Sequence, residues 1–428
     1  MKSSAFSELQ KLISEDRLRT SSGGPKGVLI ASESDKGRVI NSASFRRLQQ
    51  KAQVFPLDPN AAVRTRLTHS VEVSQIGRHI AQRVIKNHAD DHGGDYETLA
   101  AFVNLVETAC LLHDIGNPPF GHLGESAVRY WFKDNGFTYP DLLNFDGNPQ
   151  GFRLMSYLSG EDDFGFNLTC SLLLSTIKYP FAQSATTKNK FGYFSTEYET
   201  YKACCEKLNW DEGKKFPFMH LMDTADDIAY SLSDLEDGLE KKIITLGDLK
   251  EAFKEFGENL FPSGSIDPFV VFKTNIINDA TEVAAKQFSN SLDGVLNGHD
   301  KKLLDGSDVK VLLDSINKYA RKHIYSHESA EQVELAGRSV ISGLLTHFKI
   351  LLDLNDVEFE KLTDGKAKGL DFEARLLRRI PQSYINKYKT SKSPEDLRRA
   401  QLIVDYISSM TDDFALETYQ ILQGIRIK

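Results

Sequence analysis

Apolar side chains recur along most of the chain at intervals of three and four positions, the spacing of one face of an α-helix. Between 66 and 86 this stripe consists of Leu67, Val71, Ile76, Ile80 and Val84. The same spacing predicts helices over 97–114, 217–240, 269–290, 308–325, 329–352 and 397–424. The chain is therefore predicted to be mainly α-helical.

Signals for β-strands are weak. The segments "KGVLIAS" (26–32) and "KFGYFST" (190–196) are candidates for short strands or for one arm of a hairpin. Clusters of Gly, Pro, Ser and Asp predict loops near 20–27, 144–151, 159–165, 262–268 and 363–370. No internal repeat or linker is evident. We expect one mainly helical domain over 1–428, with helical insertions and at most a short β-hairpin.

Composition narrows the class of protein. The chain has 428 residues, 40% of them apolar, and a net charge of −8, which argues against a general nucleic-acid coat. The four cysteines, at 110, 170, 204 and 205, form no Cys-x-x-Cys pair and predict a reducing compartment. No secretory leader and no unbroken apolar run of about 18 residues is present. The expected location is the cytoplasm, without a membrane partner.

The segment "LLHDIGNPPFGH" (111–122) contains the first candidate chemistry. Pro118 and Pro119 cannot continue the apolar helix that precedes them, so His113 and Asp114 should lie at a buried helix end. An imidazole and a carboxylate together suit a divalent ion such as Mn, Fe, Zn or Mg. Two adjacent residues cannot complete a coordination sphere, so further ligands are needed.

Two other segments supply ligand types. His69 lies in the first predicted helix, and the predicted helix 217–240 is acidic on one face. That face is expected to carry Asp226, Tyr230 and Asp234, with Asp223 one turn earlier and Asp227 pointing away. Taken singly, each feature has a plain structural reading, as a core histidine or a solvated face. Their combination in otherwise apolar helices favours a metal site.

The order His69, His113-Asp114 and Asp226 resembles the HD superfamily of metal-dependent phosphohydrolases. Longer motifs resemble the deoxyguanosine triphosphate triphosphohydrolases within it. They are "RVINSASFRRLQQKAQVFPLDPNAAVRTRLTHSVEVSQIGR" (38–78), "HDIGNPPFGHLGE" (113–125), "GNPQGFRL" (147–154), "KYP" (178–180), "ADDIAYSLSDLEDG" (225–238) and "DYISSMTDDFA" (405–415). The resemblance implies an HD helical fold with its catalytic core over about 38–240. A less recognisable helical region, about 241–428, would pack on that core and contribute to oligomer contacts.

The resemblance also implies an activity: hydrolysis of a deoxynucleoside triphosphate, dGTP above all, to deoxynucleoside and inorganic triphosphate, by attack of water at the α-phosphorus. The implied ligands of a divalent ion (Mn, Mg or Fe, with Zn or Ni as alternatives) are His69, His113, Asp114 and Asp226. The implied proton donor to the leaving oxygen is His122, oriented by Glu125. The implied substrate-binding residues are Gln53, Val54, Arg66, Asn117, Lys178, Tyr230 and Asp234.

Two alternatives stay open from the sequence. One is another HD-type phosphohydrolase, a nucleotidase or phosphodiesterase; the other is a non-catalytic HD protein that binds nucleotide or nucleic acid. The segment 375–399 carries 8 basic and 2 acidic residues with Tyr384 and Tyr388 interleaved. It could hold a triphosphate, single-stranded DNA or a neighbouring subunit, or be a solvated face. The resemblance further implies a homo-oligomer, with a hexamer favoured, and leaves a deoxynucleotide effector open.

Overall fold

The computed structural model describes residues 5–90, 95–160, 162–183, 190–257, 260–262, 267–366 and 368–425. Within these ranges no β-strand occurs, only isolated bridges between Arg17 and Thr169, Ala52 and Thr65, and Ala182 and Tyr193. The first half of the chain forms α1 (Ala5–Lys11), α2 (Val28–Ile40), α3 (Ala43–Arg47), η1 (Leu48–Gln50), α4 (Arg66–Asn87), α5 (Tyr96–Leu112), α6 (Gly121–Asp134), α7 (Pro140–Leu143), α8 (Gly147–Arg153), η2 (Leu154–Leu158), α9 (Cys170–Ser175), η4 (Ser195–Glu197) and α10 (Tyr198–Lys207). The second half forms α11 (Pro217–Glu240), α12 (Leu246–Ala252), η5 (Lys254–Phe256), α13 (Pro268–Asn290), α14 (Leu292–Leu296), α15 (Asp308–Ala320), η6 (Arg321–Tyr325), α16 (Glu328–Leu352), α17 (Asp356–Thr363), α18 (Asp371–Leu377), α19 (Gln382–Thr390), α20 (Glu395–Ser408) and α21 (Asp412–Leu422). The predicted mainly helical fold is confirmed.

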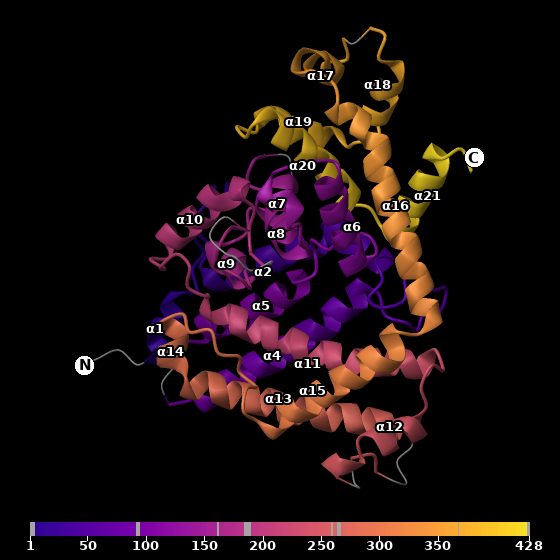
Figure 1. Ribbon diagram of the computed structural model, residues 1–428. Helices are drawn as coiled ribbons and strands as arrows, with labels where there is room; N and C mark the ends of the chain where they lie inside the picture. Colours follow the sequence, from indigo (N-terminus) through magenta and orange to yellow (C-terminus); the bar gives the residue numbers. More distant parts are fainter. Residues whose placement is uncertain are drawn as a thin grey trace.

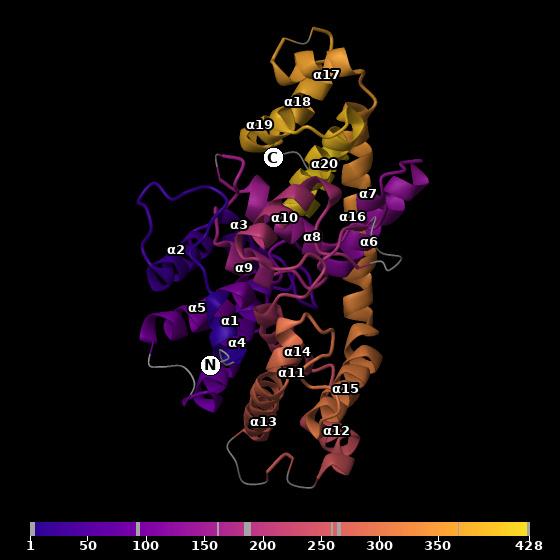
Figure 2. The same cartoon turned by 90° about the vertical axis from the view of Figure 1, so that its left-hand side faces the viewer.

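Two apolar clusters form the core. The first surrounds α4, which packs against α5, α11 and α13. The second surrounds α16, which packs against α6, α20 and α21. Figure 1 shows α4, α5, α11 and α13 in the body of the molecule and α16 along one side of it. In Figure 2 the same long helix connects the α15 end to the α17–α18 end.

Local signals explain where the helices of the site begin. Thr65 and Thr68 form a reciprocal capping box, which starts α4 at Arg66. The Asp95 side chain accepts a hydrogen bond from the Thr98 backbone and caps α5. Pro217 occupies the first turn of α11, where its missing N–H costs nothing. These caps set the register of the helices that carry His69, His113 and Asp226.

Several predicted elements differ from the structure. The candidate strand 26–32 is a helix from Val28, and the segment 190–196 contains a single bridge at Tyr193 followed by η4. The loop predicted over 144–151 includes the start of α8. One helix was predicted over 397–424, but α20 ends at Ser408 and Thr411 caps a new helix, α21. The apolar face continued through this break, so periodicity did not reveal it.

By length and composition alone, α16 could cross a membrane: its most apolar 18-residue window has a mean hydropathy of 1.2, and 39% of that window is buried. The sequence expectation of no such segment rested on unbroken apolar runs, which α16 lacks. Its buried face packs against α6, α20 and α21. A helix in the core of a protein meets the same criterion, so the finding assigns no membrane.

Candidate metal and phosphoester site

His69 and His113 present their ring nitrogens to a common point from two helices. His69 lies in the first turn of α4 and is fully buried. His113 follows the last residue of α5, and its Nδ1 lies 2.7 Å from the carbonyl oxygen of Cys110. Because a carbonyl only accepts, this Nδ1 carries the proton and the Nε2 keeps its lone pair. His113 Nε2 makes no hydrogen bond within the described residues, as a ligand nitrogen should.

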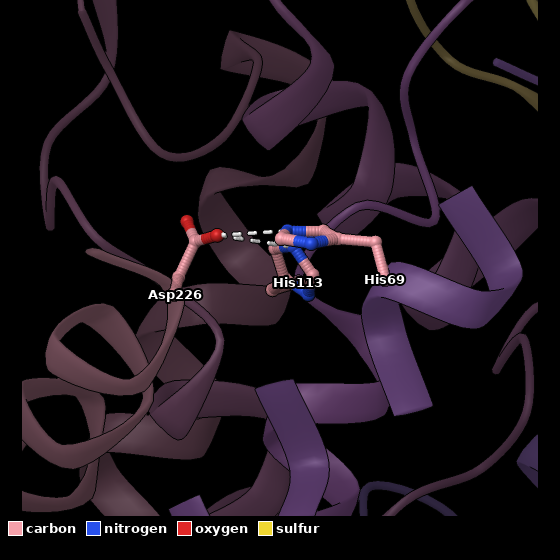
Figure 3. A group of neighbouring side chains, drawn as sticks. All are labelled: His69, His113 and Asp226. Carbon is pink, nitrogen blue, oxygen red and sulfur yellow. Dashed lines mark hydrogen bonds and ion pairs between the residues drawn. The ribbon is translucent and has the colours of Figure 1, made fainter. Parts of the chain in front are cut away.

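Asp226 of α11 completes the group. Its Oδ1 lies 3.3 Å from His69 Nε2 and 3.4 Å from His113 Nε2. The three ligand atoms lie within 4.8 Å of one another, and Figure 3 shows the side chains pointing together. Burial opposes ionisation of Asp226, but Lys178 and His113 outweigh it and hold the pKa of this carboxyl well below its usual range. Two imidazoles and an ionised carboxylate therefore fit a divalent cation of the transition series or Mg²⁺.

Asp114 lies beside this group and not within it. Its Oδ2 is 3.6 Å from His113 Nε2, but it accepts a hydrogen bond from Arg66 Nη1 at 2.6 Å. Asn117 Nδ2 donates to the other oxygen at 2.5 Å. Despite burial, Arg66 keeps the pKa of Asp114 far below its usual range. The carboxylate is thus ionised and adjacent, and it is paired with a cation in this structure.

Lys178 pairs with Asp226 in the way that Arg66 pairs with Asp114. Its Nζ lies 2.7 Å from Asp226 Oδ2 and 3.2 Å from Asp223 Oδ1, which raises its pKa well above the usual range despite burial. The two cations that the sequence assigned to phosphate, Arg66 and Lys178, therefore each neutralise a candidate ligand. This pairing satisfies buried charges that would otherwise be costly.

His122 and Glu125 form a second functional unit at the start of α6. His122 Nδ1 lies 3.1 Å from Glu125 Oε2, and the His122 side chain is 81% exposed while that of Glu125 is 4% exposed. The backbone N–H of Gly147 donates to the other Glu125 oxygen at 2.8 Å. The hydrogen bond that His122 donates to Glu125 raises the pKa of His122. A buried carboxylate therefore holds an imidazole whose other nitrogen is free to reach a ligand.

A cavity of about 360 Å³ joins these features where the two apolar clusters meet. Among the sequence-predicted residues, it is lined by His113, Asp114, Asp226, His122, Glu125, Gln53, Val54, Arg66, Asn117, Lys178 and Tyr230. Two predicted residues do not line it. His69 lies behind the wall at the metal group, and Asp234 is 1% exposed, behind Tyr230 and Tyr325. The cavity brings the proposed metal, acid and phosphate groups together.

Tyr325 is a site residue that sequence reasoning missed. Its hydroxyl lies 2.7 Å from the Tyr230 hydroxyl and 2.5 Å from Asp234 Oδ2. Burial raises the pKa of Asp234 to about 7, and its other oxygen has no hydrogen-bond partner in the described residues. Tyr325 ends the π-helical turn η6, far along the chain from Asp234. No local pattern could have predicted this contact.

Further charged residues around the cavity were also missed or misread. Lys190 and Lys302 line it; Lys190 pairs with Asp146 at 2.5 Å, and Lys302 with Asp227 at 2.8 Å. Asp227 was expected to point away, but it lines the cavity, where it accepts a hydrogen bond from Lys302. Arg64 is buried in ion pairs with Glu72, Glu236 and Asp237, which no local pattern in the sequence indicates.

The basic segment 375–399 offers no stacking surface. Tyr384 and Tyr388 are 8% and 9% exposed and belong to the second apolar cluster. Lys387 is buried and bonds to the 162–163 turn, and Arg399 pairs with Glu395 at 2.8 Å. Nucleic-acid bases therefore cannot stack on these two tyrosines, because their rings are buried in the second apolar cluster.

The helical fold and the His-Asp group define an HD-type, metal-dependent phosphohydrolase. The HD domain family matches residues 66–142, and the phosphohydrolase-associated domain matches 372–421. A deoxyguanosinetriphosphate triphosphohydrolase from Enterobacter sp. (strain 638) is 33% identical over 93% of this chain and 94% of its own length. Proteins of the same name from Yersinia enterocolitica and Yersinia pestis (strain Pestoides F) are 35% and 34% identical, over 92% of this chain and 93% of their own. The chain belongs to the deoxyguanosinetriphosphate triphosphohydrolase family.

Proposed function

We propose that this protein hydrolyses deoxynucleoside triphosphates, dGTP in particular, to the deoxynucleoside and inorganic triphosphate. One observation carries the proposal: the His69–His113–Asp226 group and the His122–Glu125 pair meet at one cavity. The first is suited to the α-phosphate and the second to the leaving oxygen. The names of the relatives and the length over which they match support the same reaction.

The chemistry replaces one bond to phosphorus with another. Water adds to the α-phosphorus, the bond from phosphorus to the sugar 5′ oxygen breaks, and a proton must reach that oxygen. His122 donates this proton from Nε2, because its Nδ1 is held by Glu125 and the same contact raises the pKa of the imidazole, which favours its protonated form. Glu125 is buried and bonded to Gly147, so it orients the ring throughout.

His69, His113 and Asp226, with Asp114 as the adjacent fourth group, would hold the divalent ion. A cation bound there supplies Lewis acidity at the α-phosphate. We propose Mn²⁺, Mg²⁺ or iron, with Zn²⁺ or Ni²⁺ as alternatives, because the donor set is nitrogen and carboxylate without thiolate.

Two cations lie beside the candidate ligands. Arg66 pairs with Asp114, and Lys178 pairs with Asp226. Both line the cavity, so the guanidinium and the ammonium are the groups that would bind the triphosphate and stabilise its charge. Lys190, at the same cavity, extends the positive surface. Asn117 lines the same cavity, and its amide can donate to a phosphate oxygen.

Four other residues that line the cavity suit the nucleoside. Gln53 and Val54 offer an amide and an apolar surface to the base. Tyr230 and Tyr325 place two hydroxyls at the sugar side, and a 2′-hydroxyl would need space next to these rings. Asp234 acts here through Tyr325, whose hydroxyl it orients.

We further propose a cytoplasmic homo-oligomer, with a hexamer favoured, because the resemblance to the family implies assembly. A deoxynucleotide effector and single-stranded DNA are the proposed regulators. Buried Tyr384 and Tyr388 limit any DNA contact at 375–399 to phosphate groups on exposed cations. Sedimentation measures the size of the assembly, and its change on adding a deoxynucleotide or single-stranded DNA tests the two proposed regulators.

Product analysis tests the reaction itself. The purified protein is incubated with Mn²⁺ or Mg²⁺ and each of the four deoxynucleoside triphosphates, plus GTP, and the products are resolved by anion exchange. Inorganic triphosphate formed from a deoxynucleotide supports the proposal, and Asp226→Asn should abolish it. Orthophosphate or a nucleoside monophosphate would contradict the proposal and assign the chain another HD-type hydrolysis. Glu107→Gln, a carboxylate on α5 paired with Lys36 and Arg78, is the matched control.

A further inference from the structure

The segment 405–415, which spans the end of α20 and the start of α21, bonds to α8 and to the backbone near residues 51–52 and 117–120. Asp405 accepts from Arg153 Nη2 at 2.9 Å and from Gln150 Nε2 at 3.0 Å, both on α8. The carbonyl oxygen of Ser408 accepts from Lys51 Nζ at 2.8 Å. Asp412, in the first turn of α21, reaches the two loops that carry proposed substrate and acid groups. The break between α20 and α21 therefore contacts several segments of which parts line the cavity.

Asp412 is a buried carboxylate whose two oxygens serve different loops. Its Oδ2 accepts the backbone N–H of Ala52 at 2.9 Å, and its Oδ1 accepts the backbone N–H of Phe120 at 2.9 Å. Ala52 directly precedes Gln53, and Phe120 lies two residues before His122. Asp412 is 2% exposed and is not among the residues that line the cavity. Asp412 therefore connects the two backbone segments at Ala52 and Phe120, which line the cavity, without lining the cavity itself.

The loop at Phe120 needs such a connection. Phe120 and Gly121 both have left-handed backbone, with φ of 60° and 57°. This costs free energy for Phe120 and leaves its N–H, at the cap of α6, without a helical partner. Its ring packs so closely on α16 that a Cβ at Gly337 would lie 2.6 Å from it. The ring is thus fixed by α16 and the amide by Asp412.

Lys51 makes a second connection of the same kind. Its Nζ donates to the carbonyl oxygens of Asn117 at 2.5 Å and Ser408 at 2.8 Å, and the side chain is 3% exposed. Its Nζ lies at the C-terminal end of α20, and burial lowers the pKa of Lys51 to about 7 although Asp412 opposes this. The two connections hold the 51–52 and 117–120 backbones against the same helix break.

We propose that Asp412 is a positioning residue that sets the separation between Gln53 and His122. These are the groups assigned to the nucleoside and to the leaving oxygen, so this inference rests on the proposed function. One carboxylate can accept both amides, whereas an asparagine accepts one and repels the other. Losing either contact releases one wall relative to the other. A displacement of about 1 Å at a reacting group lowers turnover by roughly 100-fold.

Asp412→Asn tests the proposal against Asp141→Asn. Asp141 is 4% exposed and accepts from the Ser195 backbone at 2.8 Å and hydroxyl at 2.6 Å, away from the cavity. Both variants are assayed for kcat and KM well below their Tm, and backbone hydrogen exchange is followed in peptides spanning Ala52 and Phe120. We expect Asp412→Asn to lower kcat by about 10- to 100-fold. Both peptides should also exchange faster, while Asp141→Asn loses only Tm.

A kcat within about twofold of wild type, or unchanged exchange in both peptides, would overturn the proposal. So would an equal loss of kcat in Asp141→Asn, because that is the signature of general destabilisation. If Asp412→Asn does not fold, Asp412→Ser, which keeps one acceptor, takes its place in both the kinetic and the hydrogen-exchange measurements. Should wild-type protein turn over no nucleotide, the proposed function fails, and hydrogen exchange still decides whether Asp412 fixes both loops.

Discussion

Replacing Glu125 by Gln should move the alkaline limb of the kcat profile to lower pH. In the wild-type protein the Glu125 carboxylate, 3.1 Å from Nδ1, raises the pKa of His122. Gln keeps the volume and the acceptor for Gly147 but removes the charge. The pKa of the imidazole then returns toward its ordinary value of about 6.5. Since the proposed acid acts when protonated, activity is lost as the pH rises through this lower pKa.

The size of the effect follows from the fraction of protonated imidazole. Each unit by which the pKa falls leaves about tenfold less imidazolium on the alkaline side. General acid catalysis contributes about 10²- to 10⁴-fold to the rate. The loss of kcat in Glu125→Gln should be smaller than this, because His122 itself remains. We expect kcat of Glu125→Gln to lie within about threefold of wild type near pH 6 and to fall by up to roughly 30-fold near pH 8, where about 3% of an imidazole with a pKa of about 6.5 is protonated.

The assay measures inorganic triphosphate at saturating substrate and Mn²⁺ across this pH range, so that the pH dependence of metal binding does not enter. Glu107→Gln is the control, because its ion pairs with Lys36 and Arg78 lie on α5 outside the cavity. The same fold loss at every pH would refute the reasoning. Glu125 would then matter only through its hydrogen bond to Gly147.

Three further predictions concern the metal, the sugar wall and the α6 loop. Chelation should abolish turnover reversibly, and adding Mn²⁺ back should raise Tm with concentration, as calorimetry will show, because the ion binds the folded state. Tyr325→Phe should cost about 1–3 kcal/mol by leaving Asp234 unpaired. The pKa of Asp234 is raised to about 7, so its burial lowers the stability of the folded protein as the pH rises and the carboxyl ionises. Urea unfolding should therefore show that Tyr325→Phe lowers the free energy of unfolding more near pH 8 than near pH 5. An equal loss at both pH values contradicts this. Gly121→Ala should destabilise more than Gly136→Ala in the same measurement: both glycines have positive φ, but only at Gly121 would a Cβ lie 2.5 Å from Arg66 Nη2.

The helix pattern shows what sequence periodicity can predict. The helices predicted over 66–86, 97–114 and 217–240 are confirmed as α4, α5 and α11 within two residues at each end. Their apolar stripes are long, and their starts carry caps or a proline. Periodicity failed over 26–32 and 397–424. A short apolar run does not separate strand from helix, and a capped break leaves an apolar face unbroken.

The candidate site divides in the same way. Ligand types could be identified from His69, His113 and Asp226, because adjacent or regularly spaced residues on apolar helices carry a local signal. Tyr325 and Lys302 carry none, since they meet Asp234 and Asp227 only through the packing of segments that lie far apart in the chain. Charge pairing was equally hidden: nothing near Arg64 in the sequence shows that three carboxylates surround it.

The helical class, the family motifs and the chemical type of each candidate ligand could be predicted from the sequence, because these depend on local spacing and side-chain identity. Which groups share a cavity, and which are paired, depends on how distant segments pack. The tertiary structure places Asp114 with Arg66 and Lys178 with Asp226, and it turns the 405–415 motif into a connection between the two walls. The physical reason is that buried charges and amides must find partners, and those partners come from segments that only folding brings together.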